Sequence, residues 1–186
     1  MISTMYLHFT STNSILDLKD HKYREGNPEM DQNLRLSFTV DQSPEEVFAA
    51  ILNVRGWWSE EVEGRTDQIG QFKYHYRDIH RSTINITELA PNEKVVWHIV
   101  DNYFNFVEDK SEWTGTDIVF DIIKGEGKTE VRFTHVGLVP SYECYSVCSD
   151  SWGTYINGSL RDLIAKGKGK PNQNEQIVTR HRLENS

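Results

Sequence analysis

Apolar and polar residues alternate along six short stretches of the chain, which is the pattern of half-buried β-strands. The first is LRLSFTV, residues 34–40, in which every second side chain is apolar. The other five cover residues 70–76, 82–89, 93–100, 115–123 and 130–138. Short turns, among them Pro91-Asn92 and Gly125-Glu126-Gly127, separate the later stretches. Since short turns join antiparallel neighbours, we expect one antiparallel sheet.

Helical signals occur twice after the first strand and once after the last. Ser43, Pro44 and Glu46 supply an N-cap, a first-turn proline and a capping box, so a helix begins there. RGWWSE, residues 55–60, predicts a second short helix. A long helix is expected over residues 141–166, where a stripe with helical spacing runs through positions 145, 148, 152, 155, 156, 159 and 163. At 1.5 Å per residue it is roughly 39 Å long, enough to cross a sheet.

These elements leave polar segments at both ends of the chain. Residues 1–33 show no sustained hydrophobic period and are interpreted as an N-terminal extension. The periodic part, residues 34–166, is expected to form one domain, followed by a polar, basic and mobile tail over residues 167–186.

Composition and charge exclude several classes of protein. The chain has 186 residues and a formal net charge of −8, so it lacks the basic face that a nucleic-acid-binding protein needs. No apolar run approaches the ~18 residues of a membrane span. Two cysteines are too few for a disulfide scaffold. Because no leader segment is recognised, a cytoplasmic location is the expectation.

Three stretches of the sequence resemble a known family. FTVDQSPEEVFAAILN, WTGTDIVFDIIKGEGKTEVRFTHVGL and SWGTYINGSLRDLI are similar to the first strand and helix, the last hairpin and the terminal helix of the START-like (SRPBCC, helix-grip) superfamily. The branch it resembles most is that of the activator of heat-shock protein 90 ATPase, in its C-terminal domain. The resemblance spans residues 34–166. It implies an α+β fold in which a curved antiparallel sheet of about six strands wraps around the long C-terminal helix.

The same resemblance implies a cavity between the concave face of the sheet and the long helix. Carried over by strand parity, its expected ligand-binding residues are Trp58, Phe72, Tyr74, Tyr76, Trp97, Ile99, Phe120, Phe133, His135, Trp152 and Tyr155. The alternative is that these aromatic side chains simply fill the core. Tryptophan and tyrosine suit a pocket that is partly apolar and partly polar.

Candidate catalytic and metal-binding residues are few. His135 is expected on the inward face of the last strand, where it either contacts a ligand or is a structural histidine with protein partners. Histidines 75, 80 and 98 fall on alternating faces of different strands, so no metal site is expected. Cys144 and Cys148 lie on the buried stripe of the long helix and are interpreted as buried thiols. No catalytic set and no cofactor are predicted, and the acidic segment around Glu61 is expected to be a solvated loop.

Three functions remain open from the sequence. The favoured one is non-catalytic binding of a small lipophilic molecule in the cavity. A second is a co-chaperone-like protein-interaction module acting on a heat-shock ATPase, with the aromatic segment 101–113 as its candidate contact surface. A third is an enzyme resembling polyketide cyclases, which would need a polar pair of side chains inside the cavity.

Overall fold

The structure, a computed structural model, describes residues 32–173. The chain divides into two units, Met1–Asp31 and Gln32–Ser186, and the described residues lie in the second. The predicted N-terminal extension therefore lies outside the described residues except for its last two positions, and so does the chain after residue 173.

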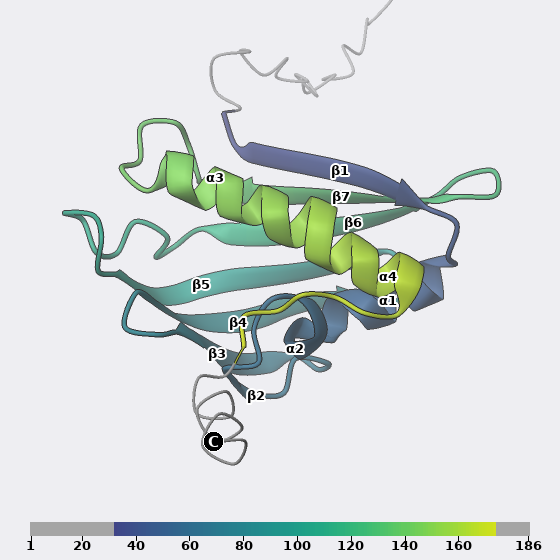
Figure 1. The fold of residues 1–186 in the computed structure, drawn as a ribbon, viewed down its shortest axis with the longest axis horizontal. Helices are drawn as coiled ribbons and strands as arrows, with labels where there is room; N and C mark the ends of the chain where they lie inside the picture. Colours follow the sequence, from purple (N-terminus) through teal and green to yellow (C-terminus); the bar gives the residue numbers. More distant parts are fainter. Residues whose placement is uncertain (1–31, 174–186) are drawn as a thin grey trace, which may run out of the picture. The chain divides into compact units, whose positions relative to one another are not determined.

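Seven antiparallel strands form one sheet in the order β1-β7-β6-β5-β4-β3-β2 (Figure 1). Their bounds are β1 (Leu34–Val40), β2 (Val62–Gly64), β3 (Gly70–Tyr76), β4 (His80–Ala90), β5 (Lys94–Phe104), β6 (Asp117–Lys124) and β7 (Thr129–Val136). All six predicted strands are present. The seventh, β2, corrects the expected acidic loop: Val62 is buried and pairs with Tyr74 of β3. Three residues are too few to show a period of two in the sequence.

The helices follow the predicted order. They are α1 (Pro44–Leu52), α2 (Val54–Trp57) and one continuous long helix made of α3 (Tyr145–Gly153), the π-helical η2 (Thr154–Leu160) and α4 (Arg161–Lys166). The Ser43–Glu46 capping box is present at the start of α1. The long helix begins at Tyr145, four residues later than predicted, where the Glu112 carboxylate accepts hydrogen bonds from two backbone N–H groups just before it. Gly167, with φ of 73°, ends the helix.

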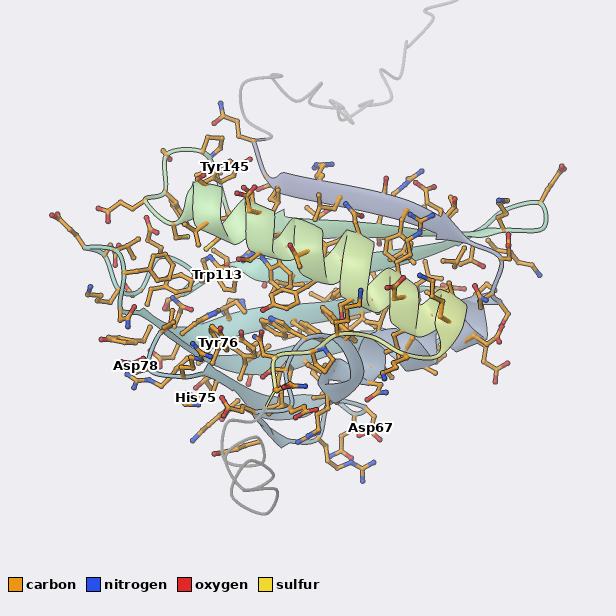
Figure 2. All side chains as sticks on the ribbon, in the orientation of Figure 1. Asp67, His75, Tyr76, Asp78, Trp113 and Tyr145 are labelled. Atoms are coloured by element: carbon orange, nitrogen blue, oxygen red, sulfur yellow. The ribbon has the colours of Figure 1, made fainter. Side chains whose placement is uncertain are left out.

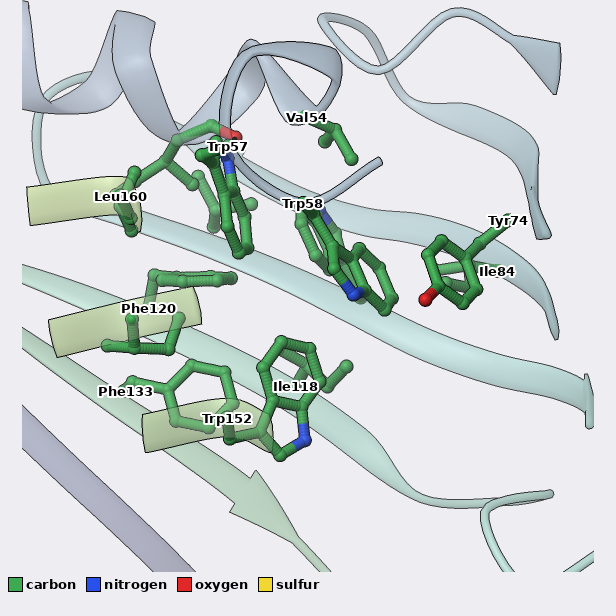
Figure 3. Packing of buried hydrophobic residues seen from close by; sticks show 14 of the residues in the cluster. Val54, Trp57, Trp58, Tyr74, Ile84, Ile118, Phe120, Phe133, Trp152 and Leu160 are labelled. Carbon is green, nitrogen blue, oxygen red and sulfur yellow. Dashed lines mark hydrogen bonds between the residues drawn. The ribbon is translucent and has the colours of Figure 1, made fainter. Parts of the chain in front are cut away.

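The core lies between the long helix and one face of the sheet (Figure 3). Alternate residues of each long strand point toward the helix, as the period of two requires. Trp152, in the middle of the helix, is 1% exposed and contacts Phe133 of β7 at 4.8 Å between ring centroids. This arrangement is the helix-grip fold that the sequence predicts, with one strand more than expected.

The first residues after the long helix, which belong to the predicted tail, pack against the domain. Residues 167–173 run back over α2 (Figure 1). Asn172 pairs with Ser59 as a parallel bridge, and the backbone N–H of Lys170 donates to Ser159 Oγ at 2.6 Å. Gly169 is buried so tightly that a Cβ there would lie 2.3 Å from the carbonyl oxygen of Gly56. We call residues 167–173 the C-terminal strap.

Candidate functional site

A pocket of about 470 Å³ lies between the first half of the long helix and the β3–β5 part of the sheet. This volume falls within the usual range for small-molecule sites. The pocket is partly open to solvent. Its lining residues are Trp58, Tyr74, Tyr76, Ile79, His80, Phe104, Asn105, Phe106, Trp113, Val147, Cys148, Ser151, Trp152 and Tyr155.

Five side chains of the long helix form one wall of the pocket. Val147, Ser151 and Tyr155 are four residues apart, and Cys148 and Trp152 repeat this spacing one position later. Residues four apart lie on the same side of a helix, so all five face the pocket. The π-helix begins at Thr154, between Trp152 and Tyr155, and widens the helix where it borders the pocket.

A β-bulge shapes the opposite wall. Thr83 of β4 pairs with Asp101, whereas its neighbour Ile84 pairs with Ile99, so Val100 is an extra residue of β5. The extra residue reverses the facing of the strand beyond it. As a result Asn102 and Phe104 are buried, although the parity of Trp97 and Ile99 would point them outward.

Stacked aromatic rings form most of the surface, and eight of the fourteen lining residues are phenylalanine, tyrosine or tryptophan. Trp58 stacks on Tyr74 with ring centroids 4.0 Å apart and planes at 13°. Trp113 stacks on Trp152 at 5.7 Å and 12°. Figure 2 shows Trp113 and Tyr76 at the end of the sheet where the long helix begins. Rigid aromatic walls of this kind suit a flat apolar molecule.

The C-terminal strap holds two of these aromatic side chains in place. The hydroxyl of Tyr155 donates to Asn172 Oδ1 at 2.9 Å, and Asn172 Nδ2 donates to the Tyr74 hydroxyl at 3.3 Å. Burial raises the pKa of both tyrosines above their usual value of 10, so the hydroxyls stay neutral. The strap therefore fixes the edge of the pocket that β3 and the helix share.

One cluster of polar side chains lies against the aromatic wall. His80 Nε2 is 3.0 Å from Asn102 Oδ1 and 2.8 Å from Ser82 Oγ, and the Ser82 hydroxyl donates to Asn102 Oδ1 at 2.8 Å. Burial lowers the pKa of His80 from 6.5 to about 3, against the opposing effect of its hydrogen bond with Asn102. His80 is therefore a neutral side chain at physiological pH.

His135 lies behind the pocket rather than in its wall. It is fully buried, as predicted, and both ring nitrogens have protein partners. Trp152 Nε1 donates to Nδ1 at 3.1 Å, and Nε2 lies 2.9 Å from the hydroxyl oxygen of Thr116. That hydroxyl donates to the carbonyl of Trp113, so Nε2 carries the proton and donates to Thr116. Burial lowers the pKa of His135 to about 3.

The structure brings together five of the eleven residues that the sequence suggested: Trp58, Tyr74, Tyr76, Trp152 and Tyr155. The other six fill the core beyond the pocket and do not line it: Phe72, Trp97, Ile99, Phe120, Phe133 and His135. Sequence reasoning missed nine lining residues, among them His80 and Trp113. His80 was recoverable, since it lies two positions before Ser82 and shares the inward parity of β4.

The cysteines and acidic residues form no further site among residues 32–173. Cys144 and Cys148 are free and buried, as predicted. The hydrogen bond with Cys144, together with burial, raises the pKa of the Cys148 thiol, so it stays protonated where it borders the pocket. Within the described part of the chain, no group of three or more His, Cys, Asp or Glu side chains is arranged to hold a metal ion. None of the described helices has the length and hydrophobicity of a membrane-spanning segment.

Fold and pocket together define a START-like, helix-grip domain. Residues 41–165 match the family described as "Activator of Hsp90 ATPase homolog 1-like protein". The match covers more than half of the chain, and the chain therefore belongs to this family. No curated protein matches the sequence.

Solved structures agree with this assignment. The chain is similar to the Aha1 dimer from Colwellia psychrerythraea, with 26% identity and a TM-score of 0.59, over 74% of this chain and 98% of that one. Protein MLL2253 from Mesorhizobium loti matches with 12% identity and a TM-score of 0.56, over 71% and 95%. DynU16, a putative protein in the dynemicin biosynthetic locus, matches with 12% identity and a TM-score of 0.56, over 77% of this chain and 51% of DynU16. The last two likenesses concern the fold alone.

Proposed function

We propose that the domain binds a small, mostly apolar molecule in this pocket without transforming it, in the cytoplasm. The observation that carries the proposal is a partly open pocket of about 470 Å³ walled by eight aromatic side chains. No lysine, arginine, aspartate or glutamate lines it. An apolar molecule gives up no hydrogen bonds to water on entry, and each Å² of its surface removed from water stabilises the complex by about 25 cal/mol.

A neutral dye that fluoresces in apolar surroundings, Nile red, tests this proposal. We expect saturable binding of one dye per chain. Ser151→Trp should abolish it, because Ser151 is exposed on the helix and lines the pocket, so a larger side chain has room to enter. Asp150→Trp is the matched control: Asp150 is exposed on the same helix and does not line the pocket. Equal dye binding by both variants would contradict the proposal.

A second candidate function is contact with another protein, such as a heat-shock ATPase. The supporting observation is the apolar rim of the pocket, where Phe106 is 42% and Val147 55% exposed. The solved relative from Colwellia psychrerythraea is itself described as a dimer. If the rim serves protein contact, Phe106→Ser with Val147→Ser should abolish association with the ATPase and leave dye binding measurable.

A further inference from the structure

The polar cluster in the pocket wall defines which chemical group a ligand should carry. His80 is 8% exposed and is surrounded by three aromatic rings. Its centroid lies 4.4 Å from that of Phe104 and 4.8 Å from those of Tyr74 and Trp113. A histidine in such surroundings has few polar partners, so the partners it does have fix the position of its proton.

Hydrogen bonding within the cluster determines the tautomer. Asn102 Nδ2 donates to the carbonyl of Lys110 at 3.3 Å, which orients the amide so that Oδ1 faces the cluster. The Ser82 hydroxyl donates its hydrogen bond to that same oxygen. Neither neighbour of Nε2 therefore has a proton to give it, and Nε2 must itself be the donor. Because the ring is neutral, Nδ1 carries no proton and has a free lone pair.

This lone pair has no partner among residues 32–173. His80 Nδ1 makes no hydrogen bond with any of residues 32–173. Among the described residues, the fully buried side-chain atoms without a partner are Gln42 Oε1, Trp97 Nε1 and Trp113 Nε1, so His80 Nδ1 keeps some exposed surface. His80 lines the pocket, so Nδ1 is the polar atom of this residue that is left for a ligand.

Three hydroxyl groups of the pocket are already hydrogen-bonded within the protein. The hydroxyls of Tyr74 and Tyr155 are held by Asn172. The Ser151 hydroxyl donates to the carbonyl of Val147 at 2.7 Å, and its side chain is exposed at the opening. The lining also has no charged residue to pair with a charged ligand, and burying an unpaired charge is costly.

We infer that the preferred ligand is a neutral, planar aromatic molecule carrying a hydroxyl or N–H group, which donates a hydrogen bond to His80 Nδ1. This inference rests on the proposed function. The aromatic rings would supply most of the binding affinity, and His80 would select ligands that carry a hydrogen-bond donor. Once a ligand covers this acceptor, an analogue that cannot donate leaves it unpaired, so the site discriminates against such analogues.

Two matched probes test the inference: 2-naphthol, which has a hydroxyl donor, and 2-methoxynaphthalene, which keeps the rings and the oxygen but cannot donate. Titrations followed by the tryptophan indole N–H resonances give both affinities. We expect 2-naphthol to bind about three- to tenfold more tightly, the factor that one net hydrogen bond supplies. His80→Phe should remove this preference and retain binding of 2-methoxynaphthalene. His98→Phe, a change on the outer face of β5, should retain the preference.

The outcomes separate the two proposals. If neither probe binds, the proposed function itself is wrong. If both bind equally, or if the preference survives in His80→Phe, the pocket binds ligands but His80 does not select them. Because His80→Phe could fail to fold, a second measurement uses the wild-type protein. Long-range proton–nitrogen correlation spectra should show Nδ1 of His80 unprotonated and shifted by 2-naphthol alone, and a proton on Nδ1 would overturn the inference.

Discussion

Acidification should destabilise the domain steeply below about pH 6.5, because the folded state holds two histidines neutral. Burial lowers the pKa of His80 and of His135 from 6.5 to about 3. In the unfolded chain both rings are exposed to water and return to the usual pKa near 6.5. The stabilisation that comes with neutral rings is therefore complete above about pH 6.5 and is lost as the pH falls toward 3.

The magnitude follows from proton linkage. Between the two pKa values the unfolded chain binds a proton on each ring that the folded domain does not. Each proton lowers the free energy of unfolding by about 1.4 kcal/mol per pH unit, so the pair removes about 3 kcal/mol per unit. At pH 6.5 the unfolded rings are already half protonated, so between about pH 6.5 and 5 the loss is about 3 kcal/mol. This is a large part of the roughly 5–15 kcal/mol that stabilises a typical domain.

Urea unfolding followed by circular dichroism, at half-unit steps from about pH 7.5 to 5, measures this slope. The range stays above the usual pKa of carboxylates, about 4, so their protonation contributes little. His80→Phe should halve the slope, because one of the two rings is gone. His98→Phe, a change at a partly exposed position on β5, should keep it steep. A loss of less than about 1 kcal/mol between pH 6.5 and 5 would refute the reasoning, as would protonation of either buried ring in the folded state above pH 5.

Two further substitutions test the packing on either side of the pocket by urea unfolding. Trp152→Ala should lower the free energy of unfolding by about 3–5 kcal/mol, because it deletes a ring that is 1% exposed and leaves His135 Nδ1 without its donor. A loss below about 1 kcal/mol would mean that the helix does not dock on the sheet as described. Gly169→Ala should cost about 1–3 kcal/mol, since its Cβ would meet the Gly56 carbonyl oxygen at 2.3 Å. Gly153→Ala is its control and should be neutral or stabilising by up to about 1 kcal/mol, because a Cβ there meets nothing within 4 Å in the helix.

The strands and helices could be predicted from the sequence because their signals are local. Leu34, Phe38 and Val40 are buried in β1, as the period of two requires. The capping box at Ser43 needs only the residue three positions later. Elements of this kind depend on neighbours along the chain, which the sequence displays directly.

The pocket was harder to predict because irregular features build it. Strand parity that placed Trp97 and Ile99 inward fails beyond Val100, where one extra residue in β5 turns Asn102 and Phe104 inward. Trp113 comes from a loop, for which no hydrophobic period exists. Sequence periodicity predicts which face of a strand an apolar residue lies on. It does not reveal where a single extra residue forms a bulge.

The distance between helix and sheet was also beyond sequence reasoning. Phe120 and Phe133 do face the long helix, as predicted, yet they are fully buried and leave no space. Around them Trp57 and Trp152 complete a continuous aromatic core (Figure 3). Near the start of the helix, by contrast, a pocket remains, and Asn105, Phe106 and Trp113 of the loop after β5 line it. Parity predicts the facing of a side chain, whereas the presence of a cavity depends on the volumes of all its neighbours together.

The division between a filled core and an irregular pocket limits what the family relationship implies about the ligand. Phe106 and Val147, at the rim, are exposed, and substitutions at such positions usually change stability by less than about 0.5 kcal/mol. Trp152 and Phe133 are buried, and replacing them would cost several times more. Sequences can therefore differ at the rim and still form the same fold. A relative with 26% identity thus supports the helix-grip architecture, while the chemistry of the ligand must be argued from this chain's own His80 and its aromatic neighbours.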